Sequence, residues 1–253
     1  MSTAEVTSKT TSSEVKGESP LDSVHTFAMY HDLIVIRSPD AGFSEQCALL
    51  FAENDVHSHI INGGAAMEQH PTQALLDVYT LSREFSRRGG IDGKRILLVG
   101  DLARGRAVRS LIYLLGKYRG ISIDLAAPTE LRLGDDMKDY MHRRGIEFRE
   151  SQNVDQFISE ADAVYMTRIQ DEYDLELPAG NVDYTSFCLS KHSLTLLKTN
   201  AVVLHPLPRR AEIPLFVDHD PRSRYWEQVE NGMWARVALI AQMFDCELRI
   251  KSA

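Results

Sequence analysis

The chain has 253 residues, of which 43% are hydrophobic and 25% are charged, as is usual for a soluble globular protein. Its formal net charge of −8 excludes nucleic-acid binding through bulk electrostatics. No apolar run approaches the ~20 residues that a membrane span needs, so we expect no membrane partner.

The first residues, 1–17, are polar and are expected to form a flexible segment. Ser19, Pro20 and Asp22 then indicate a helix start, with a cap, a first-turn proline and an acid near the positive helix end. The apolar run DLIVIR at 32–37 predicts a parallel strand that is buried on both faces. Further on, the pattern predicts a helix at 43–54, a strand from His59 to Asn62 and a long helix from His70 to about Arg87.

The second half of the chain alternates strands and helices in the same way. The pattern predicts strands at residues 95–101, 121–128, 146–151, 163–168 and 201–206. Helices are predicted from Arg104 to Tyr118, up to Gly145, from Val154 to Ala161, before residue 201 and from Tyr225 to Phe244. This alternation predicts an α/β protein with parallel sheets and right-handed crossovers.

We therefore predict two lobes of parallel sheet flanked by helices, with an incomplete first lobe. Residues 18–82, joined by the closing segment 226–253, are expected to form this reduced first lobe. Residues 83–225 are expected to form the second lobe. In such sheets, ligands bind beyond the carboxyl ends of the strands. Polar residues follow the apolar runs at Arg37, Gln69-His70, Gly100-Asp101, Thr167-Arg168 and His205-Pro206.

The segment EQHPTQ, residues 68–73, opens the long helix. Pro71 suits a first helical turn, where its missing N–H costs nothing. His70 and Gln73 would then project from the helix start, which favours an anion or a polarised carbonyl oxygen. The alternative is a histidine that only caps the helix or packs against it.

Three more segments carry candidate binding residues. GDLARGRAVRS (100–110) places three arginines at a strand–turn–helix, which indicates either a carboxylate or phosphate clamp or a solvated basic face. Arg168 directly follows a predicted buried strand, a costly place for a charge that meets no anion or partner. HPLPRRAE (205–212) predicts either a rigid turn, with room for a cis peptide bond, or a plain loop.

Other kinds of chemistry find no support in the pattern. We can place no nucleophile–base pair, no pair of acid and base carboxylates and no metal-ligand spacing. The three cysteines are far apart and form no C-x-x-C motif, which suits a reducing cytoplasm and predicts no metal. The remaining arginines, histidine and glutamines suit the binding of a dianion and the stabilisation of an oxyanion, without a cofactor.

In their order and spacing, these motifs resemble the aspartate carbamoyltransferases of the aspartate/ornithine carbamoyltransferase family. The resemblance covers roughly residues 10–247. The matching stretches are SSEVKGES (12–19), IVIR (34–37), EQHPTQALLD (68–77), GDLARGRAVRS (100–110), YMTRIQ (165–170), HPLPR (205–209) and ENGMWAR (230–236). Seven motifs in register are a far more specific signal than any one of them alone.

The resemblance implies a role for each matched residue in carbamoyl transfer from carbamoyl phosphate to aspartate. On the carbamoyl-phosphate side stand the catalytic residues Arg37, His70 and Gln73, with His70 bonding the oxygen that becomes the oxyanion. On the aspartate side stand Arg106, Arg168, Gln170 and the backbone carbonyl of Leu207. Ser12 and Lys16 would belong to a loop that reaches a neighbouring subunit's site, which implies a trimer.

The sequence also departs from the family pattern. It contains no Ser-Thr-Arg-Thr-Arg motif, which in the family begins a phosphate-binding helix. Ser38, Arg109, Tyr173 and Ala211 replace, in that order, the usual histidine, histidine, arginine and acid. Two hypotheses therefore stay open at this point. One is an active carbamoyltransferase, and the other is a non-catalytic or repurposed relative that binds a dicarboxylate or assembles with a full-length catalytic chain.

Overall fold

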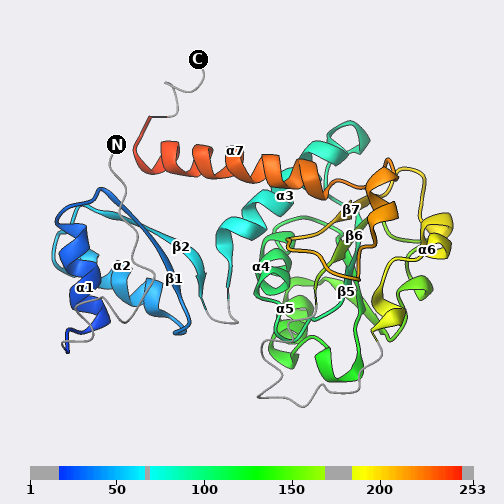
Figure 1. Cartoon of the computed structure of the whole chain (residues 1–253), viewed down its shortest axis with the longest axis horizontal. Helices are drawn as coiled ribbons and strands as arrows, with labels where there is room; N and C mark the ends of the chain where they lie inside the picture. The colour runs from blue at the N-terminus through cyan, green and yellow to red at the C-terminus, as the bar shows by residue number, and fades with distance from the viewer. Residues whose placement is uncertain (1–16, 66–68, 169–183, 247–253) are drawn as a thin grey trace. The chain divides into compact units, whose positions relative to one another are not determined.

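The computed structural model describes residues 17–65, 69–168 and 184–246, and Figure 1 shows it from N- to C-terminus. The chain divides into two compact units, Met1–Ala66 and Met67–Ala253. Both are built from parallel strands and helices, which confirms the predicted α/β fold class. The predicted lobes, 18–82 with 226–253 and 83–225, stay a prediction, and the predicted flexible segment lies almost wholly outside the described residues.

The first unit is a two-stranded parallel sheet with two helices. Strand β1 (Leu33–Ser38) pairs with β2 (His59–Ala65) from Leu33 opposite His59 onward. Helix α1 (Pro20–Ala28) precedes β1, and α2 (Phe43–Glu53) connects the two strands. The predicted start of α1 is confirmed, because the Ser19 hydroxyl accepts a hydrogen bond from the Asp22 N–H at 3.1 Å.

The prediction that β1 is buried on both faces is wrong. Ile36 is 7% exposed, whereas its neighbour Val35 is 62% exposed. Successive side chains of a strand point to opposite faces of the sheet. Helices α1 and α2 pack on β1 and β2, and among the described residues of this unit no further element covers the face that Val35 occupies. A uniformly apolar run does not show which of its faces lacks a cover.

The second unit contains a five-stranded, wholly parallel sheet in the order β5-β4-β3-β6-β7. Its strands are β3 (Arg95–Val99), β4 (Ser122–Ala126), β5 (Glu147–Ser151), β6 (Ala163–Met166) and β7 (Val202–Leu204). Its helices are α3 (Pro71–Phe85), α4 (Arg106–Leu115), α5 (Asp135–Arg144), α6 (Lys191–Leu196) and α7 (Tyr225–Met243). The chain first runs outward from β3 to β5 and then returns to the other side of β3. The strand order therefore reverses between β3 and β6.

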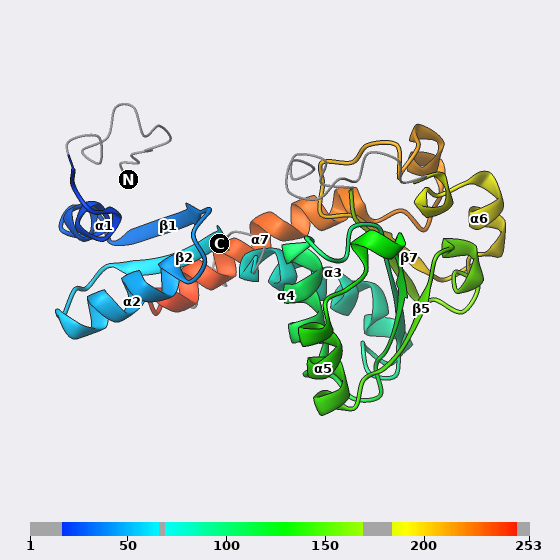
Figure 2. The same cartoon turned by 90° about the horizontal axis from the view of Figure 1, so that it is seen from below.

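Two apolar clusters cover the two faces of this sheet. Figure 2 shows the helices that carry them, with α4 and α5 on one side of the sheet and α6 on the other. Ile96 and Leu98 of β3 point into the cluster formed with α3, α4 and α5. Leu97 and Val99 point into the cluster formed with residues 154–161 and the start of α7. All four side chains are 0% exposed, which explains why the strand reads as one continuous apolar run.

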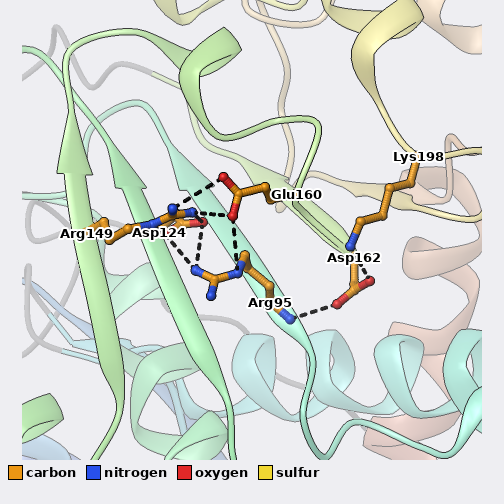
Figure 3. A network of polar contacts seen from close by, with 6 residues as sticks. All are labelled: Arg95, Asp124, Arg149, Glu160, Asp162 and Lys198. Carbon is orange, nitrogen blue, oxygen red and sulfur yellow. Dashed lines mark hydrogen bonds and ion pairs between the residues drawn. The ribbon is translucent and has the colours of Figure 1, made fainter.

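Asp124 interrupts the apolar pattern of β4, yet its side chain is 0% exposed. Arg149 of β5 donates two hydrogen bonds to its carboxylate, at 2.7 and 2.8 Å, and Arg95 of β3 lies 3.2 Å away (Figure 3). Glu160 binds Arg149 in turn at 3.1 Å. A buried carboxylate is tolerated only when it is paired in this way. The network thus ties three neighbouring strands together, through the first residue of β3 and the central residues of β4 and β5.

The predicted helix from Val154 to Ala161 is wrong. The structure has a 3-10 helix only at Val154–Gln156, followed by turns. The Asn153 side chain caps the Asp155 N–H at 2.9 Å, and Ser151 donates to the Gln156 side chain at 2.6 Å. These side-chain bonds compete with the regular helix pattern.

In the part of the chain that the structure describes, no helix is both long and apolar enough to cross a membrane.

Candidate active site

The candidate site lies where the strand order reverses, at the carboxyl ends of β3 and β6. Such a reversal is where open α/β sheets bind ligands. The N–H and the hydroxyl of Thr167 both donate to the carbonyl of Val99, at 2.8 and 2.9 Å. A Cβ on Gly100 would lie 2.4 Å from the Thr167 carbonyl oxygen. Only glycine allows the two strand ends to approach this closely.

The loop after β3 is fixed by a buried ion pair. Arg104 donates to Asp101 through its side chain at 2.7 Å and through its backbone N–H at 3.0 Å. Both side chains are almost fully buried, so this arginine stabilises the turn. Arg109 instead pairs with the exposed Asp136, and this hydrogen bond lowers the pKa of that carboxyl. The third arginine, Arg106, is the first residue of α4 and is half-buried.

His70 occupies the N-cap position of α3, and Pro71 is the first residue of the helix, as predicted. The backbone N–H of His70 donates to the hydroxyl of Ser110 at 2.8 Å. Ser110 belongs to α4, one turn beyond Arg106, so this bond holds the start of α3 about one turn from the start of α4. The positive ends of two helix dipoles therefore lie in the same region, which favours negative charge there.

Gln73 belongs to a buried polar cluster that the sequence analysis did not anticipate. Its side-chain N–H donates to Asp77 at 2.9 Å, and the Tyr165 hydroxyl donates to the other carboxylate oxygen at 2.7 Å. Gln228 of α7 donates to Asp77 at 2.5 Å. Burial raises the pKa of Asp77 to about 7, although the three donated hydrogen bonds oppose this shift. We call these four side chains the Asp77 cluster.

The loop after β7 is held at its first residue, His205. Its Nδ1 accepts the Leu207 N–H at 2.8 Å, so the proton sits on Nε2, which donates to Glu212 at 2.9 Å. Burial alone would raise the pKa of Glu212, but the bonds from His205 and from the Arg210 N–H lower it overall. The Leu207–Pro208 peptide bond is cis, as the two prolines allowed, and Leu207 has a φ of 55°.

Arg209 holds the far end of the same loop. It donates two hydrogen bonds to Asp218, one of them 2.6 Å long, and lies 5.5 Å from the ring centroids of Tyr225 and Trp226. The hydrogen bonds from Arg209 are the main reason why the pKa of Asp218 falls to about 2. The loop from His205 to Arg209 is therefore anchored at both ends, with Leu207 between the anchors.

The structure brings several of the predicted site residues to one edge of the second unit. Arg168 follows β6 and is half-buried, next to the loop that leads to Arg106. The loop after β7 joins them, because β7 pairs with β6. In the first unit, Arg37 lies near the end of β1 and is exposed. Ser12, Lys16 and Gln170 lie outside the described residues, and so does Tyr173.

Three comparisons with known proteins agree with this geometry. Residues 92–243 match the model of the aspartate/ornithine carbamoyltransferase Asp/Orn binding domain, and residues 1–83 match that of the carbamoyl-P binding domain. The chain is 41% identical to the chloroplastic aspartate carbamoyltransferase of Oryza sativa subsp. japonica, over 90% of this chain and 61% of that protein. It is 39% identical to the aspartate carbamoyltransferase catalytic subunit from Cenarchaeum symbiosum, over 92% of this chain and 72% of that protein.

Solved structures are similar over the same extent. The catalytic subunit of aspartate transcarbamoylase from M. jannaschii has a TM-score of 0.80 and 34% identity, over 93% of this chain and 74% of that one. Aspartate transcarbamoylase from Trypanosoma cruzi, solved with carbamoyl aspartate and phosphate, has a TM-score of 0.77 and 32% identity. The similarity covers 92% of this chain and 72% of that one. The chain spans about three fifths of the length of the plant relatives it matches.

Proposed function

Because this chain belongs to the aspartate/ornithine carbamoyltransferase family, we propose that it transfers a carbamoyl group from carbamoyl phosphate to the amine of L-aspartate, a reaction of pyrimidine biosynthesis. The observation that carries this proposal is the site at the strand-order reversal. It lies within the match to the Asp/Orn binding domain and presents Arg106, Arg168 and the anchored loop around Leu207 at one edge.

The proposed reaction needs positioning and charge stabilisation. The amine nitrogen of aspartate attacks the carbamoyl carbon, and the carbonyl electron pair moves onto oxygen. The resulting oxyanion collapses, which breaks the bond to the phosphate oxygen, and the departing phosphate takes up the proton that the amine nitrogen loses. His70, at the positive start of α3, would stabilise the oxyanion by hydrogen bonding. Arg37 and Gln73 would hold carbamoyl phosphate, together with Ser12 and Lys16.

Arginines suit the other half of the proposed site. Aspartate carries two carboxylates, and the guanidinium fork matches a carboxylate with two parallel hydrogen bonds. Arg106 and Arg168 would bind these carboxylates, with Gln170 beside them. The backbone carbonyl of Leu207 would accept a hydrogen bond from the substrate, in a loop that His205 and Arg209 keep in place.

The test combines turnover with binding. We expect the purified chain to form carbamoyl aspartate and to bind N-(phosphonacetyl)-L-aspartic acid in titration calorimetry. Arg168→Ala should weaken the binding of succinate by about ten- to a hundredfold, since a charge-assisted hydrogen bond contributes ~1.5–3 kcal/mol. Arg143→Ala removes an exposed arginine of α5 and serves as the matched control, with binding unchanged.

Three outcomes separate the possibilities. Succinate binding without turnover would support a repurposed dicarboxylate-binding protein. No binding of either compound would contradict the proposed function. Equal binding by wild type and Arg168→Ala would remove Arg168 from the site and leave the proposed reaction to the turnover assay.

We also propose that the chain works in the cytoplasm as a homotrimer or in a complex with a related chain. Among the described residues of the first unit, β1 and β2 pair only with each other, so the outer edge of each strand has no partner strand. The exposed Val35 and Leu49 also leave apolar surface on that unit. Sedimentation at micromolar concentration should show a species larger than a monomer. A stable monomer would contradict the assembly proposed here, and cell fractionation tests the compartment.

A further inference from the structure

We propose that Asp77 is a positioning residue that holds both halves of the proposed site, through Gln73 on one side and through Gln228 and His205 on the other. The inference rests on the proposed function, because it concerns how the same site is organised. Asp77 lies on α3, is 0% exposed and receives three donated hydrogen bonds from three different elements.

The first connection runs to the carbamoyl-phosphate side. When it is ionised, the Asp77 side chain can only accept hydrogen bonds, so Gln73 then presents its NH₂ group to it, as the structure shows. The orientation of the Gln73 amide is thereby fixed, and its carbonyl oxygen points the other way. Gln73 lies one turn from Asp77 in α3, next to the helix start at His70. Without the carboxylate, nothing in the cluster would distinguish the two amide orientations.

The second connection runs to the loop after β7. The Gln228 side chain accepts the backbone N–H of His205 at 2.9 Å and donates to Asp77 at 2.5 Å. An N–H at one end and a carboxylate at the other leave this amide a single orientation. His205 in turn accepts the Leu207 N–H at 2.8 Å. A continuous chain of bonds thus joins Asp77 to the residue whose carbonyl would face aspartate.

The ionisation of Asp77 governs the strength of these connections. The titratable and charged groups that act on it are Tyr165 of β6, which donates to it, and Arg236 of α7, which acts at longer range. Burial raises the pKa of Asp77 to about 7, against these hydrogen bonds and the charge of Arg236. Above this pH the carboxylate is charged and holds its donors more strongly, because charge-assisted hydrogen bonds are about twice as strong as neutral ones.

Asp77→Asn keeps the shape of the side chain and removes its charge. We expect it to weaken the binding of both phosphonoacetamide and succinate about tenfold at pH 8, measured by titration calorimetry. At pH 6 the expected change is less than twofold, because wild-type Asp77 is then mostly protonated. Gln228→Leu should weaken the binding of succinate more than the binding of phosphonoacetamide. Asp139→Asn, on the exposed side of α5, is the control.

A second readout does not depend on ligands. In protein labelled with ¹⁵N-glutamine, the side-chain amide signals of Gln73 and Gln228 should shift with a midpoint near pH 7, and Asp77→Asn should abolish the shift. The exposed Gln242 of α7 is the internal control. Signals that do not titrate, or equal affinities of wild type and Asp77→Asn at pH 8, would overturn the proposal. Titrating signals in a protein that binds neither compound would overturn the proposed function alone.

Discussion

At the scale of single residues, we expect the ionisation of Asp77 to have opposite effects on ligand binding and on stability. Burial raises its pKa to about 7, from an ordinary value near 4. The folded state therefore retains a proton that the unfolded chain releases. The contribution of this proton to the free energy of unfolding is fully present below about pH 4. It is lost as the pH rises through the pKa that Asp77 has in the folded state. The group that we propose to organise the site thus weakens the fold when it ionises.

We predict that Asp77→Asn is more stable than wild type at pH 8, by on the order of 1–4 kcal/mol, and that the difference shrinks toward pH 5. Asparagine does not titrate, so the cost of a buried charge disappears. Urea denaturation followed by fluorescence between pH 5 and 8 measures this difference. Asp139→Asn should follow the wild-type curve, and parallel curves for all three proteins would contradict the prediction.

At the scale of elements, the contact between the ends of β3 and β6 depends on Gly100. Its φ is 112°, and an added Cβ would lie 2.4 Å from the backbone oxygen of Thr167. Neither strand end can move without breaking the bond from Thr167 to Val99. The sequence motif around Gly100 is therefore required by the packing of two strands, whatever ligand binds beside them.

We predict that Gly100→Ala lowers the free energy of unfolding by about 3 kcal/mol. The strain of a positive φ at alanine adds to the collision of the new Cβ with Thr167. Gly145→Ala is the matched control. Gly145 also has a positive φ, of 66°, at the end of α5, but nothing lies within 4 Å of an added Cβ. Its expected cost is about 1 kcal/mol. Equal losses in urea denaturation would show that collision with Thr167 is unimportant.

The charge network on β3, β4 and β5 gives a second prediction at this scale. Asp124→Asn should lower the free energy of unfolding by about 2 kcal/mol. Arg95 and Arg149 lose a buried carboxylate partner, but both side chains keep partial access to water. Glu160 binds the same Arg149 but is 49% exposed, so Glu160→Gln should cost less than about 1 kcal/mol. Chemical denaturation at low and high salt compares the two, and a larger cost for Glu160→Gln would contradict the assignment.

At the scale of the whole molecule, the two units differ in how much core they contain. Both large apolar clusters lie in the second unit, on the two faces of its sheet. Within residues 17–65, the described part of the first unit, only six apolar side chains are buried, which are Ala28, Ile36, Cys47, Phe51, Ile61 and Ala65. A sheet of two strands with so few buried residues is marginal by itself.

We predict that a chain starting at Met67 folds by itself and unfolds cooperatively, whereas residues 1–66 alone do not form a stable fold. Circular dichroism and urea denaturation of the two fragments test this prediction. The Met67–Ala253 fragment should keep the denaturation midpoint of the complete chain to within about 0.5 M urea, since the second unit holds the clusters that stabilise it. Loss of cooperative unfolding in this fragment would contradict it.

The sequence alone determined the features that depend on neighbours along the chain. Ser19 and Pro20 marked the start of α1, and Pro71 marked that of α3, because caps and first-turn prolines act within one helical turn. Apolar runs predicted most strands of the parallel sheet, β5 being the mainly polar exception. The spacing of the motifs was enough for the family, since motifs are stretches of sequence.

Only the tertiary structure decided what depends on distant contacts. Gln228 reaches Asp77 across 151 residues, and nothing local in either segment reveals that bond. The strand order put the reversal between β3 and β6, and the missing cover on one face of β1 exposed Val35. Burial and pairing are set by what the fold brings alongside a residue, and local sequence carries no record of that.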